Sequence, residues 1–381
     1  MAKGAVFQDV TAANRSEAAA AVKPVRRPDP AASLRGRHAI AVWLWTLAGL
    51  VVVMVLVGGL TRLTDSGLSI TVWDPVMGAV PPLSEADWIA AFEMYKTTTE
   101  YQVQNSWMTL DDFKPIFWWE WGHRQLGRFI GVVWAVGLLG FLVFRVVPRG
   151  WTWRLVVPGL LGGVQGAIGW WMVYSGLVGR LDVASYRLAT HLGLAFVIFA
   201  MLVWYARRIR LPEAEIVQAR RRRAGGGGWM TAFAALAFVQ ILIGALVAGI
   251  DAGRSYTDWP LMGGEFFPSL AFSIEPFWAN FFENPGLVQF IHRMVGYVVL
   301  LAGVVLAIAL MRRAERAVRR HGLGLLLLVV AQTAIGIVTV LYAAPIEIAI
   351  WHQAGGLALW GVAISAMFTL AYPPAVRLRG G

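Results

Sequence analysis

The sequence predicts an all-α integral membrane protein, in which eight transmembrane helices form two four-helix bundles and both termini lie in the cytoplasm. Three observations favour this fold. The composition is too apolar for a water-soluble core, since 58% of the 381 residues are hydrophobic, 14% are charged and the mean hydropathy is +0.61. Eight apolar runs are each long enough to cross a bilayer, which takes about 20 residues. The two halves of the chain also repeat one another.

The eight apolar runs are separated by loops whose charge alternates. The runs cover residues 39–60, 117–144, 155–174, 188–206, 229–250, 287–311, 323–343 and 347–371. Arginine clusters precede the first run and occupy every second loop, whereas the other loops are acidic or mixed. Because basic loops stay on the cytoplasmic side, this alternation predicts cytoplasmic termini, in agreement with an even number of spans.

These spans divide the chain into two bundles and their connecting segments. The predicted segments are a basic cytoplasmic tail (1–38), a first bundle (39–206), a cytoplasmic Arg/Gly linker (207–228), a second bundle (229–371) and a cytoplasmic tail (372–381). The first bundle includes a long outer loop, 62–116, with an amphipathic helix near 84–95 that could cover a site. The first tail lacks the apolar core and cleavage site of a secretory signal. We therefore interpret it as a tail that stays on the cytoplasmic side, with a mitochondrial transit peptide as the weaker alternative.

Charge and cysteine content exclude several functions. The formal net charge of +11 indicates orientation and lipid contact in a membrane protein rather than nucleic-acid binding. The chain has no cysteine, which excludes disulfides, thiolate metal sites, iron–sulfur clusters and covalently attached haem. Any metal must therefore be bound by histidine, carboxylate or methionine side chains.

The internal repeat consists of four motifs that occur in the same order in both halves. They are LVGGL and LIGAL, each followed by the spaced residues Asp, Gly, Ser and Trp; His-Arg-x-x-Gly at residues 123 and 292; QGAIG and QTAIG at 165 and 332; and a histidine at 191 and 352. A single motif of this kind can match by chance, but four motifs that match in the same order in both halves predict a duplicated unit of four spans. Because four is an even number, both copies should insert the same way and be related by a two-fold axis along the membrane normal.

Four histidines fall near the starts of the even-numbered spans, and therefore in the outer part of the bilayer. They are His123, His191, His292 and His352, whereas His38 and His321 are expected in solvent. Each bundle offers two histidines at matching depth, which suits ligation of a haem iron from both faces. Zinc would need three or four ligands at one point. A lone membrane histidine could instead form an interhelical hydrogen bond, which is also the interpretation we favour for Gln165 and Gln332.

One carboxylate breaks the symmetry of the repeat. Glu120 precedes His123 by three residues, whereas Gln289 holds the equivalent place before His292. This difference suggests chemistry in the first bundle and a fixed electron-transfer cofactor in the second, although Glu120 could be an ordinary interfacial charge.

Arginines and glycines near the histidines also suit a haem. Arg124 and Arg293 each follow a histidine by one residue, and they could pair with haem propionates or extend to the lipid headgroups. Gly127, Gly131 and Gly296 share a helical face with the preceding histidine, leaving either a flat groove or a place where helices approach closely.

Three segments of the sequence resemble the haem A synthase family. They are GGLTRLTDSGLSITVWDPVMGAVPPLSEADW, FWWEWGHRQLGRFIG and FIHRMVGY, and the resemblance extends from the first span to the eighth. It is to the cysteine-free branch found in proteobacteria and mitochondria, so the redox role that a cysteine pair could have in other members does not apply here. The resemblance implies an oxidoreductase that converts the C8 methyl group of haem O to the formyl group of haem A for cytochrome c oxidase.

The resemblance also implies residue roles and partners. His123 and His191 would hold the substrate haem O, His292 and His352 would ligate a permanent haem b, and Glu120 matches an acidic residue implicated in catalysis. The implied partners are membrane lipid, haem O synthase, oxidase assembly factors, an unidentified electron donor and a second copy of the chain. The implied location is a bacterial inner membrane, with the mitochondrial inner membrane as the weaker alternative.

Two other functions share some of these features. A di-haem membrane cytochrome that exchanges electrons with quinol would need the four histidines, but not a carboxylate and a long outer loop in one half alone. A secondary transporter also uses duplicated bundles, with histidines as proton relays, and would bind no pigment.

Overall fold

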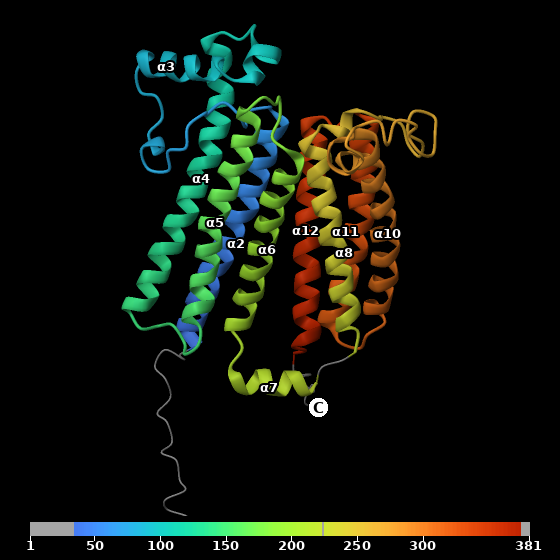
Figure 1. The fold of residues 1–381 in the computed structure, drawn as a ribbon. Helices are drawn as coiled ribbons and strands as arrows, with labels where there is room; N and C mark the ends of the chain where they lie inside the picture. The colour runs from blue at the N-terminus through green and yellow to red at the C-terminus, as the bar shows by residue number, and fades with distance from the viewer. Residues whose placement is uncertain (1–33, 223–224, 375–381) are drawn as a thin grey trace, which may run out of the picture.

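The computed structural model describes residues 34–222 and 225–374, which form an all-helical protein (Figure 1). Eight of the described helices are long and apolar enough to cross a membrane, which confirms the predicted number of spans. The predicted tail up to residue 33, residues 223–224 of the predicted linker and the predicted tail from residue 375 lie outside the described residues.

The first half contains four of the eight long helices. They are α2 (Leu34–Leu63), α4 (Leu110–Val143), α5 (Thr152–Leu177) and α6 (Ser185–Ile209). Helix α2 packs against α4 and α6, and α5 packs against the same two helices, so the contacts close a ring of four. Each helix covers its predicted span and extends beyond at least one of its ends, except that α4 ends at Val143, one residue before the predicted end of its span.

The second half repeats this order of contacts. Its long helices are α8 (Gly227–Gly249), α10 (Pro285–Met311), α11 (Arg316–Leu341) and α12 (Ile346–Ala371). Helix α8 packs against α10 and α12, and α11 packs against the same two. The equivalent positions are therefore α2 and α8, α4 and α10, α5 and α11, and α6 and α12.

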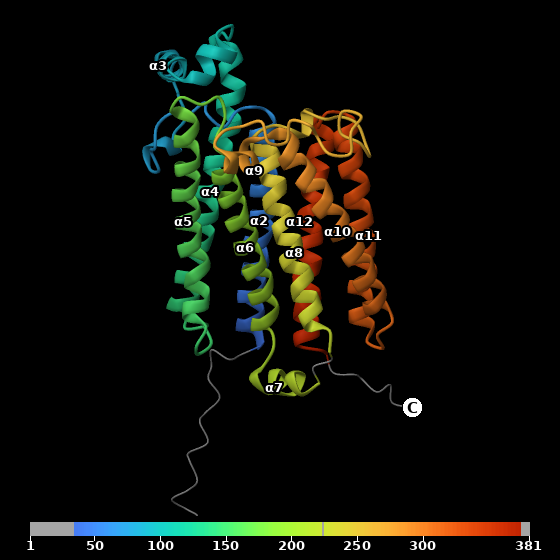
Figure 2. The same ribbon diagram turned by 45° about the vertical axis from the view of Figure 1, so that its right-hand side comes forward.

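The two halves lie side by side and share one apolar core (Figures 1 and 2). Helix α6 contacts α8 and α12, and α2 contacts α12. Polar side chains cross this junction: Trp360 Nε1 donates to Phe196 O at 3.0 Å, and Gln353 Nε2 donates to Val55 O at 2.7 Å. Such bonds satisfy groups that lipid could not, so they fix the position of one half against the other.

Helix α3 (Glu85–Lys96) lies at one end of the bundle, called here the α3 end, and confirms that a helix forms near residues 84–95 (Figure 2). It begins with a capping box between Ser84 and Asp87. Aromatic side chains pack α3 on the first turns of α4; they are Phe92, Tyr95, Phe113 and Phe117. The long loop of the first half therefore has its own small core beyond the ring of four helices.

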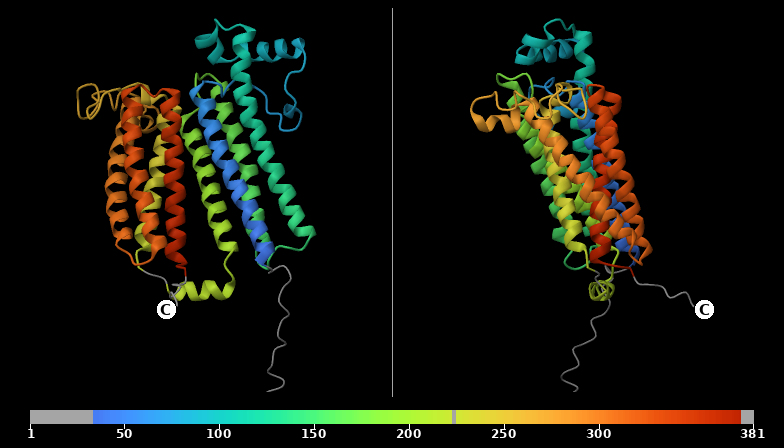
Figure 3. Two further views of the ribbon diagram at one scale, coloured as in Figure 1. Left: turned by 180° about the vertical axis from the view of Figure 1, so that it is seen from behind. Right: turned by 90° about the vertical axis from the view of Figure 1, so that its right-hand side faces the viewer.

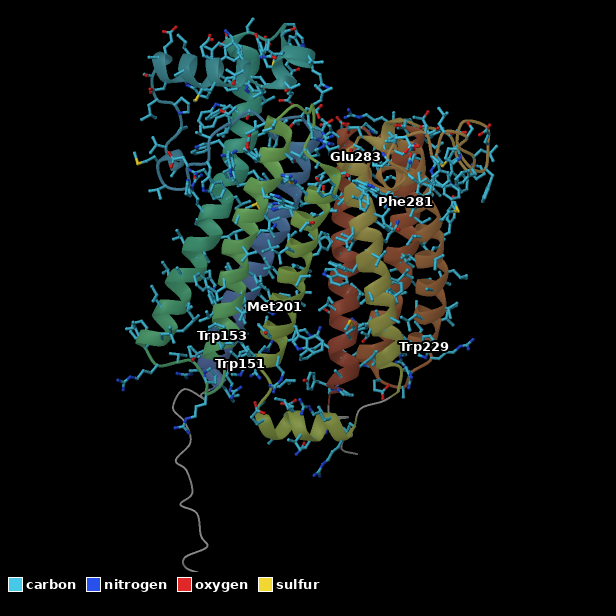
Figure 4. The ribbon with its side chains drawn as sticks, viewed as in Figure 1. Trp151, Trp153, Met201, Trp229, Phe281 and Glu283 are labelled. Atoms are coloured by element: carbon cyan, nitrogen blue, oxygen red, sulfur yellow. The ribbon has the colours of Figure 1, made fainter. Side chains whose placement is uncertain are left out.

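The second half has a shorter connection at the α3 end. It contains η4 (Ala252–Arg254), η5 (Phe277–Ala279) and α9 (Asn280–Glu283). Glu283 lies at this end (Figure 4) and pairs with Arg180 of the first half at 3.0 Å. The halves are thus joined by charge outside the apolar core as well.

Helix α7 (Glu213–Arg221) lies at the opposite end, called the α7 end, where α2 begins and α12 ends (Figure 3). The sequence predicts only a flexible Arg/Gly linker here, but Ile216 and Ala219 are buried, which gives the helix a packed face. Trp153 and Trp229 also lie toward this end and are exposed (Figure 4), as expected of tryptophans at a membrane interface.

Candidate functional site

The four predicted histidines lie on the second and fourth helices of each half. His123 is on α4, His191 on α6, His292 on α10 and His352 on α12. The ring centroids of His292 and His352 are 6.3 Å apart and their planes are 77° from parallel. In the first half, His191 is close enough to His123 to interact with it electrostatically. The structure therefore brings the histidines together in the two predicted pairs. The prediction for His321 is wrong, because it is partly buried and its Nε2 contacts Thr369 Oγ1 at 2.9 Å.

The spacing of the second pair matches what one iron requires. Two metal–nitrogen bonds of about 2 Å, with each nitrogen about 1 Å from its ring centroid, place the centroids of opposed imidazoles roughly 6 Å apart. The observed 6.3 Å agrees with this value. Two neutral nitrogen ligands from facing helices are the donor set of a bis-histidine haem, so the residues fit that group.

Each histidine ring packs against a glycine on the neighbouring helix. A Cβ atom added to any of these glycines would lie very close to Cε1 of the histidine ring. The distance would be 2.7 Å for Gly58 and His123, 2.9 Å for Gly169 and His191, 3.1 Å for Gly244 and His292, and 2.8 Å for Gly336 and His352. A real side chain would displace the ring at these distances, so the glycines make the space in which the imidazoles lie.

A glutamine lies four residues before three of these glycines, on the same face of the helix. Each glutamine Nε2 donates to the backbone oxygen of the adjacent histidine, at 2.9 Å for Gln165 to His191, 2.9 Å for Gln240 to His292 and 2.7 Å for Gln332 to His352. The same Nε2 lies 3.1–3.2 Å from the ring Nδ1 in all three cases. The predicted interhelical hydrogen bonds of Gln165 and Gln332 are confirmed, and each of these bonds holds a histidine.

The fourth position is different, because Met54 precedes Gly58. A Cβ atom added to Gly127 would lie 3.4 Å from Met54 Cε, just as one added to Gly296 would lie 3.2 Å from Gln240 Nε2. Met54 and Gln240 therefore occupy the same place in the two halves. Among the described residues, the buried Nδ1 of His123 has no hydrogen-bond partner.

Sequence reasoning missed Met54, Gln240 and the glycines that receive the rings. A common pattern could have identified them, since all four odd-numbered spans contain Gln or Met followed four residues later by Gly. This pattern faces the histidine of an even-numbered span each time.

Glu120 is buried, with 4% of its surface exposed, where the long loop meets α4. Its Oε2 accepts hydrogen bonds from Ser69 Oγ at 2.7 Å and from the backbone N–H of Ile70 at 2.8 Å. Its Oε1 forms an ion pair with Arg124 Nη2 at 2.6 Å. Arg124 also donates to the carbonyl oxygens of Ile70 and Val72. The carboxylate is thus held in one place by four donors, including Arg124 Nε at 3.1 Å.

The second half has a similar arrangement in which a glutamine replaces the carboxylate. Gln289 Nε2 and Arg293 Nη2 both donate to the carbonyl oxygen of Tyr256 at 3.0 Å. Arg293 Nη1 also donates to Asp258 O at 3.0 Å. Both arginines therefore bind the loop of their own half rather than extending away from it. Backbone N–H groups of Gly264 and Gly263 lower the pKa of the exposed Asp258 beside Arg293.

A second buried carboxylate, Glu100, lies in the long loop. It accepts a hydrogen bond from the Tyr95 hydroxyl at 3.0 Å, and Asn105 Nδ2 donates to the same hydroxyl at 2.8 Å. Burial raises the pKa of Glu100 to about 8, although the bond from Tyr95 opposes this shift. We therefore expect the packing of the loop to depend on pH.

Three other carboxylates meet at the junction of the halves, where Asp65, Asp182 and Asp251 have oxygens within 4.8 Å of one another. The guanidinium of Arg62 lies among them, at 2.7 Å from Asp65, 3.2 Å from Asp182 and 2.7 Å from Asp251. The guanidinium offsets part of the negative charge and occupies the space between the carboxylates, so we interpret the cluster as a structural ion-pair network.

Comparison with known proteins agrees with this geometry. Residues 41–364 match the family model described as "Cytochrome oxidase assembly protein". The chain is 54% identical to a protein named "Heme A synthase" from Ruegeria sp. (strain TM1040), covering 100% of both chains. It is 54% identical to the protein of that name from Dinoroseobacter shibae, over 99% of this chain and 98% of the relative, and 47% identical to that from Paracoccus denitrificans, over 100% and 99%. The chain belongs to the cytochrome oxidase assembly protein family.

Proposed function

We propose that this multi-pass membrane protein is a haem A synthase, an oxidoreductase that converts the C8 methyl group of haem O to the formyl group of haem A. The observation that supports this activity best is the full-length similarity to proteins named "Heme A synthase", together with two histidine pairs on facing helices. The product serves the assembly of cytochrome c oxidase, in agreement with the description of the family.

The two pairs have different roles in this proposal. His123 and His191 hold the iron of haem O, and His292 and His352 ligate a permanent haem b. The assignment is supported by Glu120, which lies in the first half alone, whereas the second half has the neutral Gln289. A carboxylate is needed where protons are released, and it is not needed beside a cofactor that only exchanges electrons.

When bound, the two haems supply the iron redox chemistry. The chain positions them: the four glycines admit the imidazoles, and the glutamines orient three of the rings. Glu120 accepts a proton at Oε1 or Oε2, and its four donors keep the carboxylate in place while it does so. Arg124 and Arg293 hold the loops over the two sites, which limits the entry of water.

We further propose that the halves are related by a pseudo-two-fold axis along the membrane normal, with both termini in the cytoplasm of a bacterium and the α3 end outside. The matching order of helix contacts and the arginine-rich segments at the α7 end support this topology. Exposed apolar side chains on α4, including Val132, Val136 and Leu139, suit contact with lipid.

Pigment extraction tests the function. We expect protein purified from cells that make haem O to yield haem b together with haem O or haem A. Extraction of haem b alone, from both sites, would instead identify a di-haem electron-transfer cytochrome. A colourless protein would identify neither and would favour a transporter.

A further inference from the structure

The four histidine positions differ in one residue, and this difference concerns how strongly each ring is held. Gln165, Gln240 and Gln332 contact their histidines, whereas Met54 takes this place beside His123. The remainder of the arrangement, a histidine ring against a glycine, is the same at all four positions.

A histidine that binds a metal is held in its orientation by the groups that contact it away from the metal, and losing such a contact weakens it as a ligand. In the three glutamine positions the amide Nε2 lies 3.1–3.2 Å from Nδ1, which is the nearest ring nitrogen to it. The same Nε2 donates to the backbone oxygen of the histidine at 2.7–2.9 Å. Each glutamine therefore fixes both the helix turn that carries the histidine and one side of its ring.

Methionine cannot do the same for His123, because its side chain has no N–H group to donate. Within the described part of the chain, the Nδ1 atom of His123 is buried and unpartnered. The ring is therefore located by packing against Gly58 without the hydrogen bond that the other three share.

We infer that Met54 makes His123 the exchangeable ligand of the substrate haem, while the glutamines keep the other three histidines bound. This inference rests on the proposed function, in that it takes His123 and His191 to hold haem O. It assigns Met54 as a positioning residue that acts through His123. A product haem that must leave the site needs one weaker axial bond, whereas the permanent haem b is held by two glutamine-supported histidines.

The test measures carbon monoxide binding to the reduced, purified protein, because carbon monoxide binds only where an axial histidine yields its place. We expect the wild-type protein to bind about one carbon monoxide per chain. Met54→Gln should weaken this binding on the order of tenfold or more, the usual size of such an indirect effect. The reciprocal change Gln240→Met should allow a second carbon monoxide to bind, at the haem of the second half.

Met54→Leu is the matched control, because leucine keeps the apolar volume and has no hydrogen-bonding group. It should bind carbon monoxide as the wild type does. Unchanged binding in Met54→Gln, or a Met54→Leu variant that behaves like Met54→Gln, would overturn the inference. So would a Gln240→Met variant, with its haem retained, that binds no additional carbon monoxide. Pigment extraction from the same samples reports the proposed function separately, since it identifies the haems whichever of them binds carbon monoxide.

Discussion

Replacing Glu120 by glutamine tests whether its carboxylate acts in the reaction or only fastens the long loop. The side chain has two donors on each oxygen: Ser69 and Ile70 on Oε2, and two nitrogens of Arg124 on Oε1. A glutamine keeps one oxygen and turns the other into an NH₂ group. If that group faces Arg124, both hydrogen bonds from the guanidinium are lost. If it faces the loop, the bond from the Ile70 N–H is lost, whereas the Ser69 hydroxyl can turn to accept from it. The ion pair with Arg124 is lost in either orientation.

The structural cost can be worked out from these contacts. Hydrogen bonds to a charged group contribute about 1.5–3 kcal/mol each, and removing one partner of a buried ion pair costs about 3–5 kcal/mol. We therefore expect Glu120→Gln to weaken the attachment of the long loop by about 3–5 kcal/mol. If the carboxylate also accepts protons in the reaction, turnover should fall by about 10²–10⁴-fold, with haem b still bound.

The assay is the ratio of haem A to haem O extracted from cells, normalised to the haem b retained by the purified protein. Ser69→Ala is the matched control, because it removes one hydrogen bond from the same carboxylate and leaves its charge. It should loosen the loop measurably in limited proteolysis but reduce turnover far less than Glu120→Gln. Wild-type haem A production by Glu120→Gln would refute a role in the reaction, and equal losses in the two variants would reduce Glu120 to a structural contact.

Three other outcomes follow from the geometry. Replacing His292 or His352 by alanine should lower the haem b retained after purification, and undiminished haem b would contradict their assignment. Gly336→Val should displace the His352 ring and release haem b, whereas Gly169→Val should reduce haem O binding and spare haem b; difference spectra of the purified variants separate the two. The pKa of Glu100 is raised to about 8 from its ordinary 4.5, so the folded loop binds the proton more tightly than the unfolded chain. The contribution of Glu100 to loop stability should therefore be full below about pH 4.5 and fall by a few kcal/mol as the pH rises to about 8. Glu100→Gln should lose this dependence, as hydrogen exchange at several pH values would show.

The helices were predictable because each apolar run is long and lies between charged loops. Helix α3 was also predictable, since its amphipathic pattern and capping residues are local in sequence. Helix α7 has a helical signal of its own, since EAEIVQARR after Pro212 consists mainly of good helix formers. The prediction of a flexible linker depended on the arginine and glycine run that follows it, and the burial of Ile216 and Ala219 depends on the rest of the bundle.

The histidine pairs could be predicted from depth and repetition alone. The residues that hold them could not, because their role depends on which helix faces which. Met54 looks like any apolar residue of a span until the structure places it where Gln240 stands in the other half. Glu120 was conspicuous as an asymmetric carboxylate, but its four donors come partly from Ser69 and Ile70, distant in sequence, and only the fold brings them together.

Two histidine pairs that each bind a haem are central to the proposed function. The direct measurement is the number of haems per chain in protein purified from cells with ample iron and haem O, combined with near-infrared magnetic circular dichroism, which reports axial ligands. Two haems per chain with bis-histidine signals, reduced to one by His352→Ala, are the predicted result. A protein without a Soret band, or haem ligation that is unchanged when His352 and His191 are both replaced, would contradict it.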